Sequence, residues 1–510
     1  MQDKLVLGID CGTQGLRSAL FRADGTLVAS AAQRYPTARP HINWAEQDPD
    51  DWWDALCATV RRCLDDARAS ADDVVALGVD GTSCTVVFSD DNGTPLRPAI
   101  LWMDIRAVDE AQRVEATRHP ALEHCGRRIS AEWLLPKVLW VQREEPEIYA
   151  GSAYIVEGVD WLIRRLAGRW ATSNSNAVGK RHWTPGGGWP SSLYESVRLD
   201  DLVAKSPDDV VYVGEPIGTL LPEAAAALGL SAGCTVTHAG MDGWTAIIGK
   251  NCFAPRCASL TLGTSTVVIV ETDTPRFIDG IMGPFPDGVR HGYAVYEAGQ
   301  TSGGSTIQWL FALMGAKPDV DTYARLEREA AQLPAGSEGL VVFDAFRGNR
   351  TPYFDPLARG TICGLTLEHG PAHLYRAILE GCAYGIRNVL MTLEQGGCPV
   401  DTVRACGSGA ANSLWVRIIA NVTGKRVLVS AEKDATCLGS AVCAAVAGGL
   451  HGNLAGAAAA MGPPFETIEP DVDIDVYESC FGVYLRIYQE MQGTMAELAR
   501  MADADGKAVR

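Results

Sequence analysis

The sequence predicts an α/β protein built from two duplicated domains. At about 100–200 residues per domain, the 510 residues are enough for several domains. A strand, a Gly-Thr turn and a second strand open the chain at residues 5–21, and the same pattern returns at residues 259–270. A recurrence of this kind indicates duplication. We place the boundary near residues 250–255, which gives an N-terminal domain at 1–252 and a C-terminal domain at 253–510.

The first strand is the apolar run Leu5-Val6-Leu7-Gly8-Ile9-Asp10, which ends in a carboxylate. Gly12 and Gly15 favour a tight turn, after which the apolar run resumes at residues 18–21. Asp24-Gly25 marks the next turn, before another short strand at 27–29. The chain is therefore expected to open with hairpins.

A helix is expected to begin at Pro49, because Asp48 suits the N-cap position and proline suits the first helical position. Apolar residues then recur at every fourth position, which predicts one buried face: Trp52, Leu56, Val60 and Leu64. Residues 74–79 follow as a short buried strand that ends at Asp80-Gly81. Strands and helices thus mix within one layered domain.

The second half repeats this organisation after a less regular stretch. Residues 150–240 are expected to form helices and loops, with a surface turn at Gly186-Gly187-Gly188. The strand pattern restarts at 259–270. Spaced aromatic and aliphatic residues predict a closing helix at about 474–500.

Composition excludes some classes of function. The formal net charge of -18 argues against a nucleic-acid binder and against binding to anionic membranes. No apolar run approaches the ~18 residues of a membrane span, and the first residues lack the pattern of a signal peptide. We therefore expect a cytoplasmic protein. Its 15 cysteines are expected to be buried, reduced thiols, with metal sites and disulfides as the alternatives.

The two Gly-Thr turns are candidate phosphate sites. Backbone N–H groups in such a turn can form a concave nest that binds phosphate oxygens without a lysine. Gly12 lets the backbone approach closely, Thr13 adds a hydroxyl, and Arg17 could reach the same anion. A single two-glycine hairpin is more often structural. A second nest at Gly263-Thr264-Ser265 makes a purely structural role less favoured, because two facing nests could bracket a polyphosphate.

Two aspartates are candidates for the chemistry. Asp10 ends the first strand, where a carboxylate can hold Mg²⁺ beside the β- and γ-phosphates; capping the turn is its alternative role. Asp242 begins an apolar, small-residue helix, whose dipole favours the ionised form. An ionised carboxylate can accept a proton from an attacking hydroxyl, although local sequence alone favours a plain helix N-cap.

A third glycine-rich segment runs from Cys406 to Asn412, between a strand at Val403 and a helix that begins near Ser413. Strand, small-residue loop and helix is the order in which α/β proteins approach a nucleotide. The spacing matches neither the Walker A loop nor the dinucleotide-binding fingerprint.

Together these segments resemble the FGGY carbohydrate kinases over nearly the whole chain. The matching motifs are Gly8-Ile9-Asp10-Cys11-Gly12-Thr13, Leu262-Gly263-Thr264-Ser265, Gly407-Ser408-Gly409-Ala410 and a longer signature from Gly360 to Glu380. Ser408 departs from the glycine that the family usually has there. The resemblance implies two actin-, hexokinase- and Hsp70-like (ribonuclease H-like) domains that close on a catalytic cleft. The signature of residues 360–380 is interpreted as architectural: a strand, a turn and a helix that Pro371 begins.

The resemblance also implies roles for single residues. Asp242 is the expected general base for a sugar hydroxyl, Asp10 the residue that helps to place Mg²⁺, and ATP and Mg²⁺ the cofactors. The implied phosphate and nucleotide contacts are Gly12, Thr13, Gln14, Arg17, Gly263, Thr264, Ser265, Gly407, Gly409, Ala410 and Asn412.

The expected acceptor is a small sugar, and a ketopentose ranks first. Residues 39–53 are similar to xylulokinases, whereas residues 78–84, 102–107 and 297–300 are similar to ribulokinases. D-ribulose therefore ranks slightly ahead of D-xylulose, and a polyol such as erythritol is the alternative. The candidate sugar contacts are Ser83, Cys84, Trp102, Asp104, Arg106 and Asp242.

Several of these residues have a structural alternative. Trp102 could be a core residue, and Asp104 with Arg106 a surface ion pair. Asp80 could be a second acid near the sugar, but a tight turn is the favoured role.

Two other classes of function stay open. One is a conformational ATPase of the actin or Hsp70 type, against which the signature of residues 360–380 argues. The other is a catalytically silent sugar sensor, against which the presence of Asp10 and Asp242 argues. The expected partners are the sugar and MgATP, without nucleic acid or membrane, and a homodimer is left open.

Overall fold

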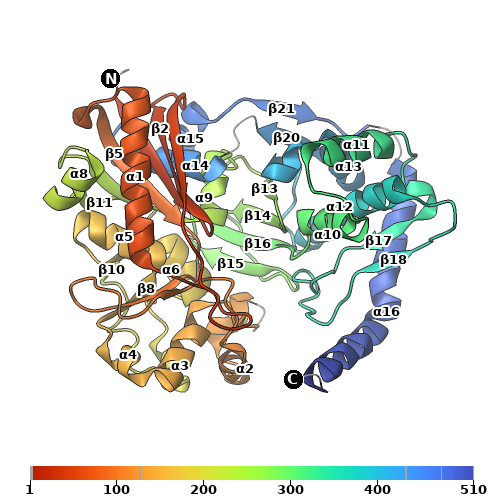
Figure 1. Cartoon of the computed structure of the whole chain (residues 1–510), viewed down its shortest axis with the longest axis horizontal. Helices are drawn as coiled ribbons and strands as arrows, with labels where there is room; N and C mark the ends of the chain where they lie inside the picture. Colours follow the sequence, from red (N-terminus) through yellow and green to blue (C-terminus); the bar gives the residue numbers. More distant parts are fainter. Residues whose placement is uncertain (1–3, 126–127, 431–433, 472–473, 509–510) are drawn as a thin grey trace.

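In the computed structural model the chain forms two α/β halves, and the structure describes residues 4–125, 128–430, 434–471 and 474–508. The strands of the first half gather on one side of the molecule and those of the second half on the other (Figure 1). Within these described ranges no helix is long and apolar enough to cross a membrane.

The first half is organised around a six-stranded sheet. Its strands, in spatial order, are β11 (Pro216–Thr219), β12 (Thr235–Met241), β5 (Val74–Gly81), β1 (Leu5–Cys11), β2 (Gly15–Arg22) and β3 (Leu27–Arg34). The neighbours β12, β5 and β1 are parallel, so their C-terminal ends meet at one edge of the sheet. The hairpins predicted at residues 5–34 are confirmed.

The second half is organised around a seven-stranded sheet. Its strands, in spatial order, are β15 (Met282–Pro286), β16 (Ala294–Gln300), β14 (Thr266–Thr272), β13 (Cys257–Leu262), β19 (Thr402–Cys406), β20 (Arg426–Ser430) and β21 (Phe465–Ile468). The hairpin predicted at residues 259–270 is confirmed as the antiparallel pair β13–β14.

The two sheets repeat one topology. The order β11-β12-β5-β1-β2-β3 corresponds to β21-β20-β19-β13-β14-β16. Each parallel or antiparallel pairing in the first sheet has its counterpart in the second. The predicted duplication is thus a property of the fold, and it places the two Gly-Thr turns at equivalent positions, after β1 and after β13.

Helices and smaller sheets complete the first half. The helices are α1 (Pro49–Ala67), α2 (Val108–Ala116), α3 (Leu134–Glu144), α4 (Pro146–Gly151), α5 (Gly158–Ala167), α6 (Asn174–Arg181), α7 (Ser191–Ser196), α8 (Pro222–Leu228) and α9 (Asp242–Gly249), with short 3₁₀ turns at Ala71–Asp73 and Pro120–Cys125. Small sheets pair β4 (Glu46–Gln47), β7 (Ala99–Ile100), β6 (Val86–Ser89) and β8 (Tyr154–Glu157), and β9 (Ala171–Ser173) with β10 (Asp209–Val211).

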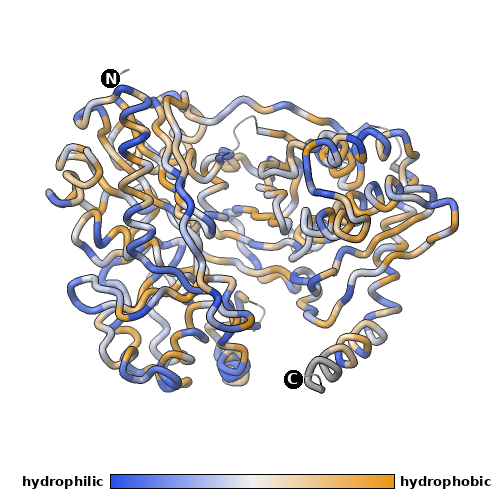
Figure 2. The backbone as a smooth tube through the Cα atoms, viewed as in Figure 1, coloured by the Kyte–Doolittle hydropathy of each residue, from blue (hydrophilic) through white to orange (hydrophobic). Residues whose placement is uncertain are grey.

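The prediction of a helix from Pro49 is confirmed. The Asp48 carboxylate accepts a hydrogen bond from the Asp50 backbone N–H at 3.0 Å, so it caps α1. Trp52, Leu56 and Val60 on its inner face are buried, while the visible outer surface of α1 is mostly hydrophilic (Figure 2). Burial of this one face holds the helix against the sheet.

The second half carries helices of its own. They are α10 (Gly304–Leu313), α11 (Val320–Ala331), α12 (Pro371–Gln395), α13 (Ser413–Thr423), α14 (Ala435–Ala447), α15 (Leu454–Met461) and α16 (Ile474–Ala508), with 3₁₀ turns at Ser337–Gly339 and Ser408–Ala411 and a hairpin of β17 (Val341–Phe343) with β18 (Thr361–Cys363). The predicted helices from Pro371 and from residue 474 are confirmed. In the signature of residues 360–380, Glu380 is buried and accepts hydrogen bonds from Arg376, Ser337 and the Gly336 N–H, which is a structural role.

Two helices of the second half pack against the sheet of the first half. Figure 1 shows α14 and α15 beside β2 and β5 rather than with the rest of the second half. Close approach requires glycine here: a Cβ on Gly8 would lie 1.9 Å from the Cys437 carbonyl oxygen, and one on Gly78 would lie 2.3 Å from that of Ser440. The backbone of α14 therefore rests almost directly on β1 and β5.

Two predictions about local structure are wrong. Residues 150–240 contain strands β8 to β12 as well as helices, and β12 is a central strand of the first sheet. Asp80 lies inside β5 rather than in a tight turn. The predicted burial of the cysteines is confirmed for most of them, and their reduced state stays a prediction.

Candidate active site

Three carboxylates meet where neighbouring parallel strands end. Asp10 is at the end of β1, Asp80 at the end of β5, and Asp242 immediately follows β12. Asp10 is paired in register with Asp80, and Asp80 with Gly240. Because the carboxyl ends of parallel strands lie at one sheet edge, residues far apart in sequence form one acidic cluster.

Asp10 is buried and tied to both halves of the chain. Its Oδ2 accepts hydrogen bonds from Arg17 Nη2 at 3.1 Å and from Thr436 Oγ1 of α14 at 3.0 Å. Burial raises the pKa of the Asp10 carboxyl, and the Arg17 charge opposes that rise. Arg17 also pairs with Asp434, so its guanidinium is engaged by two carboxylates at the edge of the turn.

Asp80 offers a buried oxygen without a donor. Its Oδ2 accepts a hydrogen bond from Ser440 Oγ at 2.5 Å, while Oδ1 is buried and has no hydrogen-bond partner among the described residues. Burial and the adjacent Asp10 charge raise the pKa of Asp80 well above its ordinary value. A carboxylate pair with an unsatisfied oxygen suits a hard divalent cation such as Mg²⁺.

The protein would supply only part of such a cation's coordination. Among the described residues no group of three or more His, Cys, Asp or Glu side chains could hold a metal. Mg²⁺ usually keeps water ligands and binds through one or two carboxylates plus substrate phosphates.

Asp242 is the first residue of α9, and Met241 occupies the N-cap position. The Asp242 Oδ1 accepts a hydrogen bond from the Gly243 N–H at 2.6 Å. Burial, followed by the Asp10 charge, raises the pKa of Asp242 to about 7. A carboxylate with this pKa can take a proton from a hydroxyl near neutral pH.

The first Gly-Thr turn is joined to a tryptophan. Thr13 Oγ1 accepts a hydrogen bond from Trp102 Nε1 at 2.8 Å, and the Thr13 carbonyl oxygen accepts one from Gln47 Nε2 at 2.8 Å. The Gly12 carbonyl oxygen accepts one from the Tyr35 hydroxyl. Gln14 is exposed at the tip of the turn. These contacts hold the carbonyls on the inner side of the turn.

The second turn lies against the start of α10. The Gly304 N–H donates to the Gly263 carbonyl oxygen at 2.8 Å, and the Ser305 N–H donates to that of Thr264 at 3.2 Å. Ser265 is partly buried and Thr264 is exposed. Gly263 thus lies beside the N-terminus of α10, where the helix dipole favours anions.

The predicted adenosine loop adjoins this second turn. Gly407 has a φ of 90°, and a Cβ on it would lie 2.5 Å from the Leu262 carbonyl oxygen. A Cβ on Gly409 would lie 2.6 Å from the Trp415 ring. Both glycines therefore let the loop lie against the end of β13.

The other two residues of this loop have structural contacts. Asn412 caps α13, because its side-chain oxygen accepts a hydrogen bond from the Trp415 N–H at 2.8 Å, and its side-chain amide donates to the Tyr375 hydroxyl. Ala410 is buried.

The predicted sugar contacts fall into two groups. Ser83, Cys84 and Trp102 lie on loops near the first turn, and Trp102 is half-buried. Asp104 and Arg106 instead form a buried ion pair, with Arg106 Nη2 2.7 Å from Asp104 Oδ2. Both Asp104 oxygens already accept hydrogen bonds, and this geometry does not favour the predicted contact with sugar hydroxyls. The pair is also buried rather than at the surface.

Sequence reasoning assigned no role to a second charged pair at the site. Lys180 Nζ of α6 lies 3.2 Å from Glu297 Oε2 of β16, and Trp244 Nε1 donates to the same oxygen at 3.1 Å. Burial opposes ionisation of Glu297, but the charges of Lys180 and Arg350 and the hydrogen bonds from Trp244 and Lys180 together hold the pKa of Glu297 below its ordinary value. Glu297 also contributes to the raised pKa of Asp242, so the pair faces the acidic cluster.

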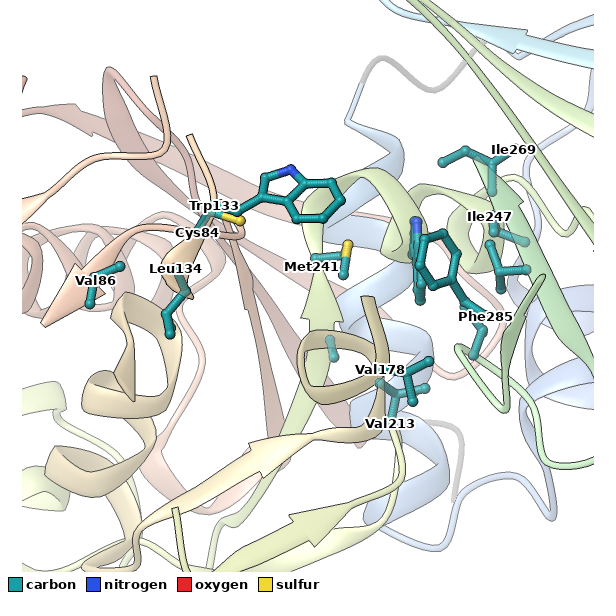
Figure 3. Close-up of a cluster of buried hydrophobic side chains, with 14 of the residues drawn as sticks. Cys84, Val86, Trp133, Leu134, Val178, Val213, Met241, Ile247, Ile269 and Phe285 are labelled. Atoms are coloured by element: carbon teal, nitrogen blue, oxygen red, sulfur yellow. The ribbon is translucent and has the colours of Figure 1, made fainter. Parts of the chain in front are cut away.

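Aromatic side chains surround this pair. Lys180 Nζ lies 5.2 Å from the Trp133 ring centroid and 5.5 Å from that of Phe285. Figure 3 shows Trp133 beside Cys84, with Met241 between these two and Phe285. The site thus combines hydrogen-bonding charges with apolar walls, as a sugar requires. Only the Glu297-containing segment gave a signal in the sequence, through its similarity to ribulokinases.

Comparison with known proteins identifies the family. The model of the FGGY family of carbohydrate kinases, N-terminal domain, matches residues 5–249, and that of the C-terminal domain matches residues 258–448. The chain belongs to the FGGY family of carbohydrate kinases. Enzymes of this family transfer a phosphoryl group from ATP, generally with Mg²⁺, to a sugar hydroxyl.

Individual FGGY kinases match over most of the chain. A ribulokinase of Bacillus licheniformis is 32% identical over 480 residues, covering 88% of this chain and 87% of that protein. A ribulokinase of Geobacillus thermodenitrificans is 30% identical, covering 96% and 94%. Among solved structures, a xylulose kinase from Rhodospirillum rubrum superposes with a TM-score of 0.85 at 26% identity, covering 96% of this chain and 100% of that one.

Proposed function

We propose that this FGGY kinase phosphorylates a ketopentose, with D-ribulose ahead of D-xylulose, at the cluster formed by Asp10, Asp80 and Asp242. The relatives named above as ribulokinases and a xylulose kinase support this class of acceptor. The observation that carries the proposal is the convergence of Asp242, with a pKa of about 7, and the Lys180–Glu297 pair between two phosphate-binding turns.

ATP is proposed to lie along the second half. The adenosine would contact the loop of Gly407, Gly409, Ala410 and Asn412, and the phosphates would reach the turns at Gly12-Thr13-Gln14 and Gly263-Thr264-Ser265. Backbone N–H groups at such turns neutralise phosphate charge without reorganising. Arg17 adds a cation at the rim of the first turn.

Asp10 and Asp80 are the residues that we assign to Mg²⁺, directly or through water. When bound, the ion would neutralise negative charge on the β- and γ-phosphates. Asp10 reaches Thr436 and Asp80 reaches Ser440, so α14 orients both carboxylates from the second half of the chain.

Asp242 is the proposed general base. Its carboxylate would orient the sugar hydroxyl and accept its proton while the γ-phosphoryl group transfers in line. We assign Lys180 and Glu297 to the sugar hydroxyls, with Cys84, Ser83 and Trp102 along the pocket wall. Asp104 and Arg106 would instead brace the loop that carries Trp102.

Closure of two domains, 1–252 and 253–510, would complete this site and exclude water. Asp242 and the Gly12 turn come from the first domain, whereas the Gly263 turn, Glu297 and Thr436 come from the second. Both domains therefore supply groups to the site, and closure would hold these groups around both substrates.

The test is ADP release with MgATP across D-ribulose, D-xylulose, L-ribulose, L-xylulose, erythritol and glycerol. We expect strong turnover with one ketopentose and little with the others. Preference for erythritol or glycerol would replace the ketopentose with a polyol. ATP hydrolysis independent of every sugar would favour a conformational ATPase, and sugar binding without turnover would favour a sensor.

A further inference from the structure

A fully buried lysine lies behind the proposed sugar pocket. Lys137 is in the first turn of α3 and has no exposed surface. Its ammonium group donates to three backbone carbonyl oxygens: Cys84 at 2.9 Å, Leu101 at 2.7 Å and Trp102 at 3.3 Å. Burying a charge costs free energy unless it is well hydrogen-bonded, so three acceptors at one ammonium are a costly and specific arrangement.

The three carbonyls belong to two separate loops. Cys84 follows β5, and Leu101 with Trp102 follows β7. These loops supply the proposed sugar-pocket residues Cys84 and Trp102. Lys137 therefore joins the two loops beside the strand pair β6–β7, in which Val86 pairs with Ile100, and beside the hydrogen bond from the Trp102 N–H to Thr85 Oγ1 at 3.3 Å.

Both loops need support. Cys84 has a φ of 65°, a left-handed conformation that non-glycine residues adopt only when their surroundings hold them there. Its carbonyl oxygen is held by the Lys137 ammonium group at 2.9 Å. Trp102 in turn donates from Nε1 to Thr13 in the first phosphate turn. One side-chain hydrogen bond thus connects the Trp102 loop to the phosphate turn.

The surroundings do not explain Lys137 as half of an ion pair. The ionisable groups that face it are Cys84, Asp104, Glu157 and Glu132. Within the described chain, no side chain of these four residues makes a hydrogen bond with the ammonium group; Cys84 contacts it only through its backbone carbonyl oxygen. Burial outweighs their influence and lowers the pKa of Lys137 to about 8.

We infer that Lys137 is a positioning residue for sugar binding, which fixes the loop of residues 82–85 against the loop of residues 101–104 through three carbonyl contacts. This inference rests on the proposed function of the site. It predicts that losing the ammonium group weakens the sugar complex while leaving the ATP site, which lies mainly on the other half of the chain, little changed.

The experiment compares Lys137→Met, Lys137→Arg and Lys250→Met with the wild-type chain, using the ketopentose that the wild type phosphorylates fastest. Lys250 is the matched control, because it is also fully buried and contacts β13 through Leu260 and Thr261. Lys137→Met should raise the KM for the sugar about tenfold, the equivalent of about one or two lost hydrogen bonds. Its KM for ATP should change less than about twofold. Lys137→Arg should recover part of the loss.

The pH dependence of the wild type gives a readout that does not require a folded variant. Above about pH 8 the neutral amine has two N–H donors for three carbonyls, so the sugar KM should rise between about pH 7 and pH 9. Lys137→Met should lack this rise. Three results would each overturn the inference. The first is a sugar KM in Lys137→Met within about twofold of wild type. The others are an equal rise of the sugar KM in Lys250→Met and a wild-type sugar KM that does not depend on pH. Absence of wild-type turnover would instead count against the proposed function, so the two failures are distinguishable.

Discussion

At the scale of single residues, the charge state of Asp242 is set by position rather than by residue type. It is partly buried at the start of α9 and lies in the field of Asp10, and both effects raise its pKa to about 7. A solvated aspartate would be ionised far below that pH and would be a weak base. The same surroundings therefore make this side chain suited to taking a proton.

Asp242→Asn removes the proposed base but keeps the size of the side chain. We expect kcat to fall by about 10²–10⁴-fold, the usual contribution of general-base catalysis, with ATP binding unchanged. Steady-state kinetics and nucleotide titration would measure the two effects. Asp321→Asn is the matched control, since Asp321 is also in the first turn of a helix but is exposed. Near-normal turnover of Asp242→Asn would show that Asp242 is not the general base.

The pH profile should report the same carboxyl. Its raised pKa means that the ionised form is lost as the pH falls through about 7. We therefore expect kcat/KM to decline on the acid side with an apparent pKa near 7, as measured by initial rates with coupling enzymes in excess. A profile that is flat from about pH 5.5 to pH 8 would contradict the assignment.

At the scale of elements, α9 and α14 are equivalent helices of the two halves. Each follows the strand at the same position in its sheet, β12 or β20, and the two pack against each other. A Cβ on Gly249 would lie 1.9 Å from the Ala435 carbonyl oxygen, and one on Gly439 would lie 2.3 Å from that of Thr245. Glycines on both helices thus allow backbone contact at the junction of the halves.

Gly249→Ala tests this crossing. The added methyl group must push α9 away from α14, which we expect to destabilise the protein by about 3 kcal/mol and to lower the urea midpoint. Gly493→Ala in α16 is the control, because no atom lies within 4 Å of its Cβ position. It should be neutral or stabilise by up to about 1 kcal/mol. Equal midpoints for the two variants would show that the crossing tolerates separation.

At the scale of the whole molecule, the site exists only because the two halves meet. Asp10 and Thr436 are 426 residues apart, and Lys180 and Glu297 are 117 apart. Ligands that contact groups from both halves should therefore stabilise both halves of the molecule against unfolding, rather than one half alone.

A non-hydrolysable MgATP analogue, at about 100 times its Kd, should add about 2.7 kcal/mol to the free energy of unfolding. Thermal unfolding with and without the preferred sugar would measure the shift. Chelating Mg²⁺ with EDTA should remove most of it, because the buried Asp10 and Asp80 carboxylates would then face the phosphates without a cation. An unchanged shift in EDTA would exclude both carboxylates from metal binding.

Features that depend on neighbours along the chain could be predicted from local residue patterns. Gly-Thr turns between apolar strands, the Asp48 cap of α1 and the helix begun by Pro371 are local, and their patterns predicted them correctly. The other features of the fold and of the site depend on contacts between segments that are distant in the sequence. The strand β12 contains polar Thr235, Thr237 and His238, so it lacks the continuous apolar run that indicated β1 and β5, and its place in the sheet is defined by its pairing with β5 and β11. Long-range contacts leave no periodic signal in the sequence, because their partners meet only when the chain folds. Examples are the contacts of Lys180 with Glu297, of Thr436 with Asp10, and of Lys137 with its three carbonyls.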